Sequence, residues 1–132
     1  MTERAVLLDT HTLFWLAHEP HRVSAPVLDV LGHEDTIVFV SAVSAYELAN
    51  KHRLGKWPTA GPMLANWSKD LERLWVQEIG IQAEHALQAG ALDWAHRDPF
   101  DRLLAAQAIA MSIPLVSGDV VMSTAPGLDV LW

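Results

Sequence analysis

Four acidic residues, separated along the chain, are the main candidates for chemistry. Asp9 closes an apolar run, and Asp119 follows a second apolar run by two residues. Both are therefore expected at the carboxyl ends of strands, the edge where open parallel sheets bind their ligands. Glu47 and Asp101 are expected early in helices, and helices that connect parallel strands begin at that same edge. The sequence predicts that these four carboxylates converge.

A cluster of this kind needs a compensating positive charge. Two carboxylates about 4 Å apart repel by roughly 4 kcal/mol at an effective dielectric constant near 20, and each raises the pKa of its neighbours. A divalent cation removes the repulsion. The candidate ligands are all oxygens and the chain contains no cysteine, which favours a hard ion, Mg²⁺ or its substitute Mn²⁺, over zinc or copper. We therefore expect a metal site formed by Asp9, Glu47, Asp101 and Asp119.

Some acidic residues near this cluster also have purely structural interpretations. Asp98, which precedes a proline, is typical of a helix N-cap, and Asp101 is favourable in the first turn of the same helix. Ser44 and Glu47 match a capping box if their helix begins at Ser44. If Ser41 is the cap, Glu47 lies in the second turn and can point to the sheet edge. The sequence leaves these alternatives open.

Capping is less attractive as an explanation of Asp9 and Asp119. A charge that ends an apolar strand rarely gains from burial without a partner, although each could cap the helix that follows. Thr10 and Thr12 are the candidate N-caps after Asp9. His11 is an alternative metal ligand, but loops after strands often carry an exposed histidine.

The balance of charge limits the classes of function. The formal net charge of −7 argues against a protein that coats nucleic acid, but it does not exclude an enzyme that holds nucleic acid through metal ions. Lys51, Arg53 and Lys56 cluster near the end of one predicted helix, and Arg102 lies at the start of another. They are either solvated helix ends or phosphate contacts beside the metal.

Several other classes of site lose support because their motifs are missing. The sequence has no G-x-S-x-G elbow and no glycine-rich phosphate loop, which argues against nucleophilic serine chemistry and nucleotide binding. Its six tryptophans are too dispersed to predict a base-stacking platform. Without cysteine there is no disulfide scaffold, and the apolar segment at residues 5–8 is too short for a signal peptide or a membrane span. We expect a cytoplasmic protein.

The elements that must position the acidic residues alternate between strands and helices over 132 residues, which predicts one α/β domain spanning residues 1–132 with a parallel sheet. Expected strands lie at residues 6–9, 36–40, 74–79, 113–116 and 129–132. Expected helices lie near residues 13–16 and at 25–31, 42–54, 64–71, 82–92 and 99–111.

The chain also resembles a known family. The blocks that carry the resemblance are Leu-Leu-Asp-Thr-His at residues 7–11, the segments at 40–56 and 96–108, Leu-Val-Ser-Gly-Asp at 115–119, and the final Val-Leu-Trp. In order and spacing they resemble PIN-domain proteins, and most of all the VapC-type toxins of type II toxin–antitoxin pairs.

This resemblance implies a three-layer α/β/α sandwich with a central parallel sheet of four to five strands. It implies an endoribonuclease that uses Mg²⁺ or Mn²⁺ to hydrolyse RNA, works as a homodimer and is blocked by a cognate antitoxin. Because the pocket would be acidic, we expect that antitoxin to present Arg or Lys to it. By this resemblance the metal-binding and catalytic acids are Asp9, Glu47, Asp101 and Asp119, with Asp98 and Ser117 as accessory residues. Thr10 is a further candidate accessory residue. The candidate phosphate contacts, chosen by their position in the sequence, are Lys51, Arg53, Lys56 and Arg102.

Two other functions remain open at this point. A haloacid-dehalogenase-like phosphohydrolase also uses an Asp after its first strand, but it would need further acids where His11 and Ser123 stand. A catalytically silent PIN-like binding module is the second alternative. A melting temperature that Mg²⁺ or Mn²⁺ fails to raise would favour it.

Overall fold

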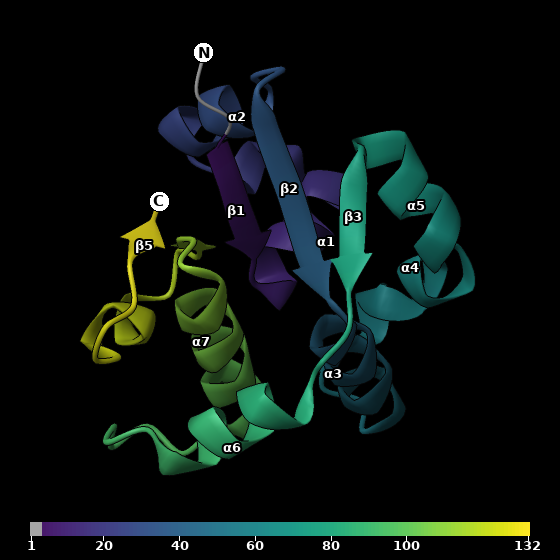
Figure 1. Cartoon of the computed structure of the whole chain (residues 1–132). Coiled ribbons are helices and arrows are strands. Elements are labelled where there is room, and N and C mark those ends of the chain that lie inside the picture. Colours follow the sequence, from purple (N-terminus) through teal and green to yellow (C-terminus); the bar gives the residue numbers. More distant parts are fainter. Residues whose placement is uncertain (1–3) are drawn as a thin grey trace.

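The computed structural model describes residues 4–132 and contains a five-stranded sheet in which every neighbouring pair of strands is parallel. The strand order is β3-β2-β1-β4-β5 (Figure 1). This confirms the predicted parallel α/β fold. The strands are β1 (Arg4–Leu8), β2 (Thr36–Ser41), β3 (Val76–Ile79), β4 (Leu115–Val116) and β5 (Val130–Leu131).

Seven α-helices and three short 3₁₀ helices connect these strands within residues 4–132. The α-helices are α1 (Thr10–His18), α2 (Ala25–Leu31), α3 (Ala42–Arg53), α4 (Gly61–Ala65), α5 (Trp67–Leu74), α6 (Ala83–Ala91) and α7 (Pro99–Met111). The 3₁₀ helices are η1 (Pro20–Arg22), η2 (Pro58–Ala60) and η3 (Val120–Thr124).

Most predicted elements are found, and the differences have local causes. Helices α2 and α7 have the predicted bounds, whereas the helix expected at residues 64–71 is divided between α4 and α5. Strand β3 begins at Val76 because Trp75 adopts a left-handed conformation, with φ of 58°, at the end of α5. The strand expected at residues 113–116 is reduced to Leu115–Val116.

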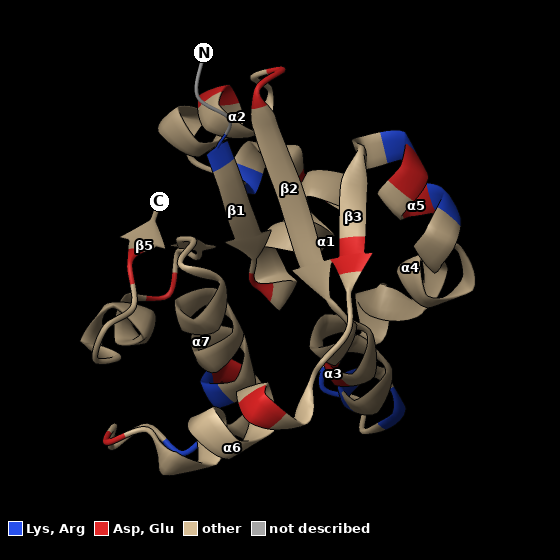
Figure 2. Ribbon diagram, in the orientation of Figure 1, with Lys and Arg blue, Asp and Glu red and all other residues tan. Residues whose placement is uncertain are grey.

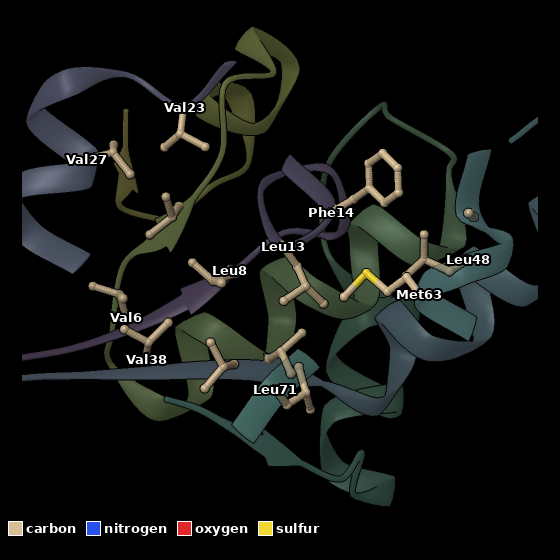
Figure 3. Close-up of a cluster of buried hydrophobic side chains, with 14 of the residues drawn as sticks. Val6, Leu8, Leu13, Phe14, Val23, Val27, Val38, Leu48, Met63 and Leu71 are labelled. Atoms are coloured by element: carbon tan, nitrogen blue, oxygen red, sulfur yellow. The ribbon is translucent and has the colours of Figure 1, made fainter. Parts of the chain in front are cut away.

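Alternating side chains of β1 divide the core between the two faces of the sheet. Val6 and Leu8 join a cluster with residues of α1, α2, α3, α4 and α5, several of which are drawn in Figure 3. Leu7 points to the other face and packs with Leu104 and Ala108 of α7. Because all five of these side chains are essentially inaccessible to solvent, helices cover both faces and the sandwich has three layers.

The strands end at the edge where the functional residues were expected. Figure 1 shows β1, β2 and β3 pointing to the end of the molecule where α3 lies. The N-cap of α1 is Asp9, whose carboxylate accepts a hydrogen bond from the Thr12 amide at 2.8 Å. The prediction that Thr10 or Thr12 caps this helix is therefore wrong.

Helix α3 begins after Ser41, whose hydroxyl accepts a hydrogen bond from the Val43 amide at 3.1 Å. The alternative capping box between Ser44 and Glu47 is therefore excluded. The Ser44 hydroxyl instead lies 2.9 Å from the hydroxyl of Thr10. Glu47 is left in the second turn, free of any capping role.

The end of the chain supports the loop after β4. A Cβ on Gly118 would lie 2.8 Å from the indole ring of Trp132, so only glycine allows this close approach. The indole therefore packs directly against the segment that carries Asp119.

Within residues 4–132 no helix is both long enough and apolar enough to cross a membrane. Residues 1–3, at the start for which we predicted no signal peptide, lie outside the described residues.

Candidate active site

The carboxyl edge of the sheet contains a pocket of about 480 Å³ lined by carboxylates from four separate segments of the chain. Figure 2 shows acidic and basic segments together on α3 and α7 at this edge. The structure thus brings together all four predicted acids, together with Asp98. The carboxylates lining the pocket are Asp9, Glu47, Asp98, Asp101 and Asp119.

Asp9 is placed by the end of β1 and is only 8% exposed. Burial raises the pKa of its carboxyl group above the ordinary value, and hydrogen bonds with Ser117 and Thr12 oppose that shift. Ser117, one of the expected accessory residues, therefore contacts the first acid of the site. Its hydroxyl also accepts a hydrogen bond from the Asp119 amide at 3.1 Å.

Glu47 is 3% exposed, and partners within the chain engage both of its carboxylate oxygens. The Thr10 hydroxyl donates to Oε1 at 2.6 Å, and the Lys51 ammonium donates to Oε2 from one turn later on α3. Partial burial alone would lower the pKa of Lys51. The hydrogen bond to Glu47 and the charges of Glu47, Asp98 and Asp101 outweigh it and raise that pKa.

Asp101 is held at the start of α7 by His96, whose Nε2 lies 2.7 Å from Oδ2 of the carboxylate. Burial is the largest cause of the raised pKa of Asp101; the hydrogen bond with His96 opposes it, and the charges of Asp98 and Glu47 add to it. Asp98 is the N-cap of the same helix, as predicted. Its Oδ1 accepts hydrogen bonds from the amides of Phe100 and Asp101.

Asp119 is the solvent-exposed member of the group. It caps η3 through a hydrogen bond of 3.1 Å from the Val121 amide to Oδ1. Asp119 therefore caps a helix, which is its structural interpretation, and its carboxylate also lines the pocket. The same is true of Asp9, which caps α1.

The donor set fits a hard divalent cation, because the converging groups are carboxylate oxygens and burial disfavours them as uncompensated ions. In the present arrangement, however, no three His, Asp or Glu side chains of residues 4–132 are close enough together to hold a metal ion. Lys51 supplies positive charge to Glu47 instead, and His96 hydrogen-bonds Asp101. For the acids to bind a cation together, they would have to move closer to one another and Lys51 would have to leave Glu47.

The four basic residues expected at phosphates have different surroundings. The guanidinium of Arg102 donates four hydrogen bonds of 2.6–3.0 Å to the carbonyls of Ala89, Leu92, Trp94 and His96. Since these bonds engage four of its five donors, Arg102 holds the loop between α6 and α7 and has a single N–H left for a phosphate. Lys51 lines the acidic pocket. Lys56 lines an adjoining groove, and Arg53 is exposed at the end of α3.

Sequence reasoning missed two residues of the pocket, His96 and Trp15. His96 lies outside the expected helices and strands, five residues before the candidate ligand Asp101. Trp15 lies four residues after His11 on α1, a spacing that places both on one face of the helix. His11 also lines the pocket, and its ring stacks on Trp57 with centroids 4.4 Å apart.

A protein-family model matches most of the chain. The PIN domain model matches residues 6–128. The chain belongs to the PIN-domain family. This membership sets aside the haloacid-dehalogenase-like alternative.

Individual relatives extend the comparison. Over 115 residues, 86% of each chain, the sequence is 36% identical to Ribonuclease VapC22 of Mycobacterium tuberculosis. VapBC2 from Rickettsia felis, solved with a DNA fragment from its promoter, has a similar structure with a TM-score of 0.72 at 18% identity, covering 96% of this chain and 97% of that one. A toxin–antitoxin complex from Klebsiella pneumoniae gives 0.60 at 16% identity, covering 96% of each chain. At these identities the structural matches establish the fold.

Replacing Asp9 by Asn tests the electrostatic description of the pocket. Asn keeps the cap of α1 and removes the buried charge, so in EDTA the variant should be more stable than the parent at about pH 7. The raised pKa means that the folded parent binds a proton more tightly than the unfolded chain. As the pH falls from about 7 toward about 4, the buried carboxyl of the folded parent takes up a proton. The parent's free energy of unfolding therefore rises relative to that of the variant. The variant's advantage should shrink toward about pH 4.

Urea unfolding at several pH values measures this difference. Asp29→Asn, at an exposed position of α2, makes the same change of charge and should show no comparable advantage. An Asp9→Asn variant less stable than the parent at neutral pH would contradict the description.

Proposed function

We propose that this chain is a divalent-metal-dependent endoribonuclease and the toxin of a toxin–antitoxin pair. The observation that carries the proposal is the convergence of five carboxylates from four segments on one pocket of a PIN-domain chain. The 36% identity to a protein named Ribonuclease VapC22 supports RNA as the substrate.

Asp9, Glu47 and Asp101 would hold Mg²⁺, or Mn²⁺ in its place, with Asp119 as an outer fourth acid. When bound, such an ion lowers the pKa of a water molecule and neutralises charge that develops at the phosphate. The chain itself orients the acids. Thr10 fixes one oxygen of Glu47, His96 fixes one oxygen of Asp101, and Thr12 fixes one oxygen of Asp9.

Lys51 has a second task in this proposal. Its ammonium lies among the charges of Glu47, Asp98 and Asp101 and stays protonated because they raise its pKa. Once released from Glu47, it can donate to a phosphate oxygen at the mouth of the pocket. Water is the nucleophile, so no side chain forms a bond to phosphorus, and hydrolysis would leave a 5′-phosphate and a 3′-hydroxyl.

A second candidate function is a catalytically silent PIN-like binding module. The observation that favours it is the lack, among residues 4–132, of three acidic or histidine side chains already placed to hold a metal. The two functions differ in their response to metal. The nuclease should melt at a higher temperature when Mg²⁺ or Mn²⁺ is added, because ligand binding stabilises the folded state.

Cleavage of single-stranded RNA by the purified protein tests the nuclease directly. Glu47→Gln and Asp101→Asn should each lower the cleavage rate by more than about a hundredfold and weaken Mn²⁺ binding in parallel. Even partners that only contact metal ligands cost about 10- to 100-fold when removed. Glu72→Gln, at an exposed position of α5, is the matched control and should leave both quantities unchanged. Parental cleavage by Glu47→Gln would defeat the ligand assignment.

We also propose a cognate antitoxin as the partner. The acidic pocket in a chain of net charge −7 suits a partner segment that presents Arg or Lys, because Arg pairs bidentately with carboxylates and can take the place of the cation. The VapBC2 and Klebsiella structures come from toxin–antitoxin systems and support this choice. A homodimer, implied by the family resemblance, stays a prediction.

If the antitoxin inserts such a segment, its binding should compete with Mn²⁺ and weaken as the salt concentration rises. Calorimetric titration of the purified antitoxin, with and without saturating Mn²⁺ and at two ionic strengths, measures both effects. An affinity that is indifferent to both would mean that the antitoxin blocks the pocket without replacing the cation.

A further inference from the structure

The loop that carries Asp119 runs from the end of β4 to the start of η3 and consists of three residues, Ser117, Gly118 and Asp119. The buried hydroxyl of Ser117 accepts a hydrogen bond from the Asp119 amide at 3.1 Å. Oδ1 of Asp119 accepts a hydrogen bond from the Val121 amide, also at 3.1 Å. Both of these bonds lie within the same short segment, so the position of the loop determines the position of the carboxylate.

Two other proposed ligands are held from outside their own helices. The Thr10 hydroxyl donates to Glu47 from α1, and the His96 ring contacts Asp101 from the loop before α7. For Asp119 the corresponding support has to act on the loop as a whole.

The indole of Trp132 provides such a support, because it packs on Gly118. A Cβ at this glycine would lie 2.8–3.2 Å from three atoms of the indole ring. The glycines with positive φ are Gly55 and Gly127, so Gly118 is not needed for an unusual backbone conformation. It is needed because any side chain would displace the ring or the loop.

The same indole also approaches the helix that Asp9 caps. Its ring centroid lies 6.0 Å from that of Trp15 on α1, a separation typical of paired aromatic rings. Trp15 and Gly118 both line the acidic pocket. Trp132 therefore joins the segment that follows the first acid to the segment that carries the fourth.

Filling the core does not account for Trp132. The two preceding residues, Val130 and Leu131, form β5, pair with β4 and pack against the two core clusters. Trp132 itself remains 39% exposed. Its ring therefore contributes less to the core than to the wall of the pocket.

We infer that Trp132 is a positioning residue, whose indole fixes the loop of Ser117, Gly118 and Asp119 so that the Asp119 carboxylate faces the pocket at a set distance from Asp9. The consequence for metal binding rests on the proposed function. Residues that orient metal ligands typically change metal affinity by about 10- to 100-fold.

Amide hydrogen exchange in EDTA tests the positioning without metal. In Trp132→Leu the Asp119 amide should exchange faster than in the parent, because the loop has lost its support. The amide of Leu7, in the central strand β1, reports global unfolding and should change much less. Trp132→Phe keeps a ring and should restore most of the protection. Trp75→Leu makes the same change at a residue that is 89% exposed and should leave the exchange unchanged.

Calorimetric titration with Mn²⁺ tests the consequence for metal binding. Trp132→Leu should weaken binding by about tenfold, and Asp119→Asn should weaken it by at least as much. The double variant should bind Mn²⁺ as weakly as Asp119→Asn alone, because Trp132 acts through Asp119. A tryptophan that only stabilised the fold would weaken binding in both backgrounds.

Gly118→Ala tests the same contact from the other side. Its Cβ should displace the indole or the loop and so weaken Mn²⁺ binding. In the Trp132→Leu background the ring is absent, and the same substitution should have a smaller effect.

Unchanged exchange of the Asp119 amide in Trp132→Leu would overturn the inference. Additive losses of Mn²⁺ affinity when Trp132→Leu is combined with Asp119→Asn would also overturn it. Failure of the proposed function is a different result: a parent that neither binds Mn²⁺ nor cleaves RNA would refute the nuclease. Faster exchange of the Asp119 amide in Trp132→Leu would still show, in that case, that the indole positions Asp119.

Discussion

The burial of carboxylates at the sheet edge is the constraint on which the rest of this molecule depends. Asp9 and Glu47 are almost completely buried, and Asp98 and Asp101 lie close enough for their charges to reach the same lysine. Such groups stay ionised only if positive charge is brought to them. Lys51 provides it to Glu47 from within the chain, and His96 hydrogen-bonds Asp101. In the proposed function, a metal ion or an arginine from a partner replaces the positive charge that Lys51 supplies to these acids.

In this fold the same residues cap helices and carry the negative charges of the pocket. Asp9, Asp98 and Asp119 each cap a helix while lining the pocket. Capping and metal binding are thus compatible, since a carboxylate has two oxygens and a backbone amide uses one. The parallel sheet places these helix starts at one edge, and Arg102 holds the loop before α7 through four carbonyls. Positions that look merely structural in the sequence are part of the site.

The features that could be predicted from the sequence depend on periodicity and chain order. The parallel sheet and the convergence of Asp9, Glu47, Asp101 and Asp119 follow from apolar runs and from the direction of connecting helices. The features that could not be predicted depend either on which of two nearby serines caps a helix or on contacts between residues far apart in the sequence. Whether Ser41 or Ser44 caps α3 is decided by contacts of Ser44 with Thr10, which is 34 residues away. The stacking of His11 on Trp57 likewise joins α1 to the segment after α3, which no local pattern indicates.

A crystal structure with Mn²⁺ and anomalous diffraction tests most directly whether the carboxylates form a metal site. A manganese peak should lie within about 2.0–2.6 Å of oxygens of Asp9, Glu47 and Asp101, and the Lys51 ammonium should have left Glu47. A peak elsewhere, or no peak at saturating Mn²⁺ with Lys51 still paired to Glu47, would show that these acids are balanced within the chain and do not bind a catalytic metal.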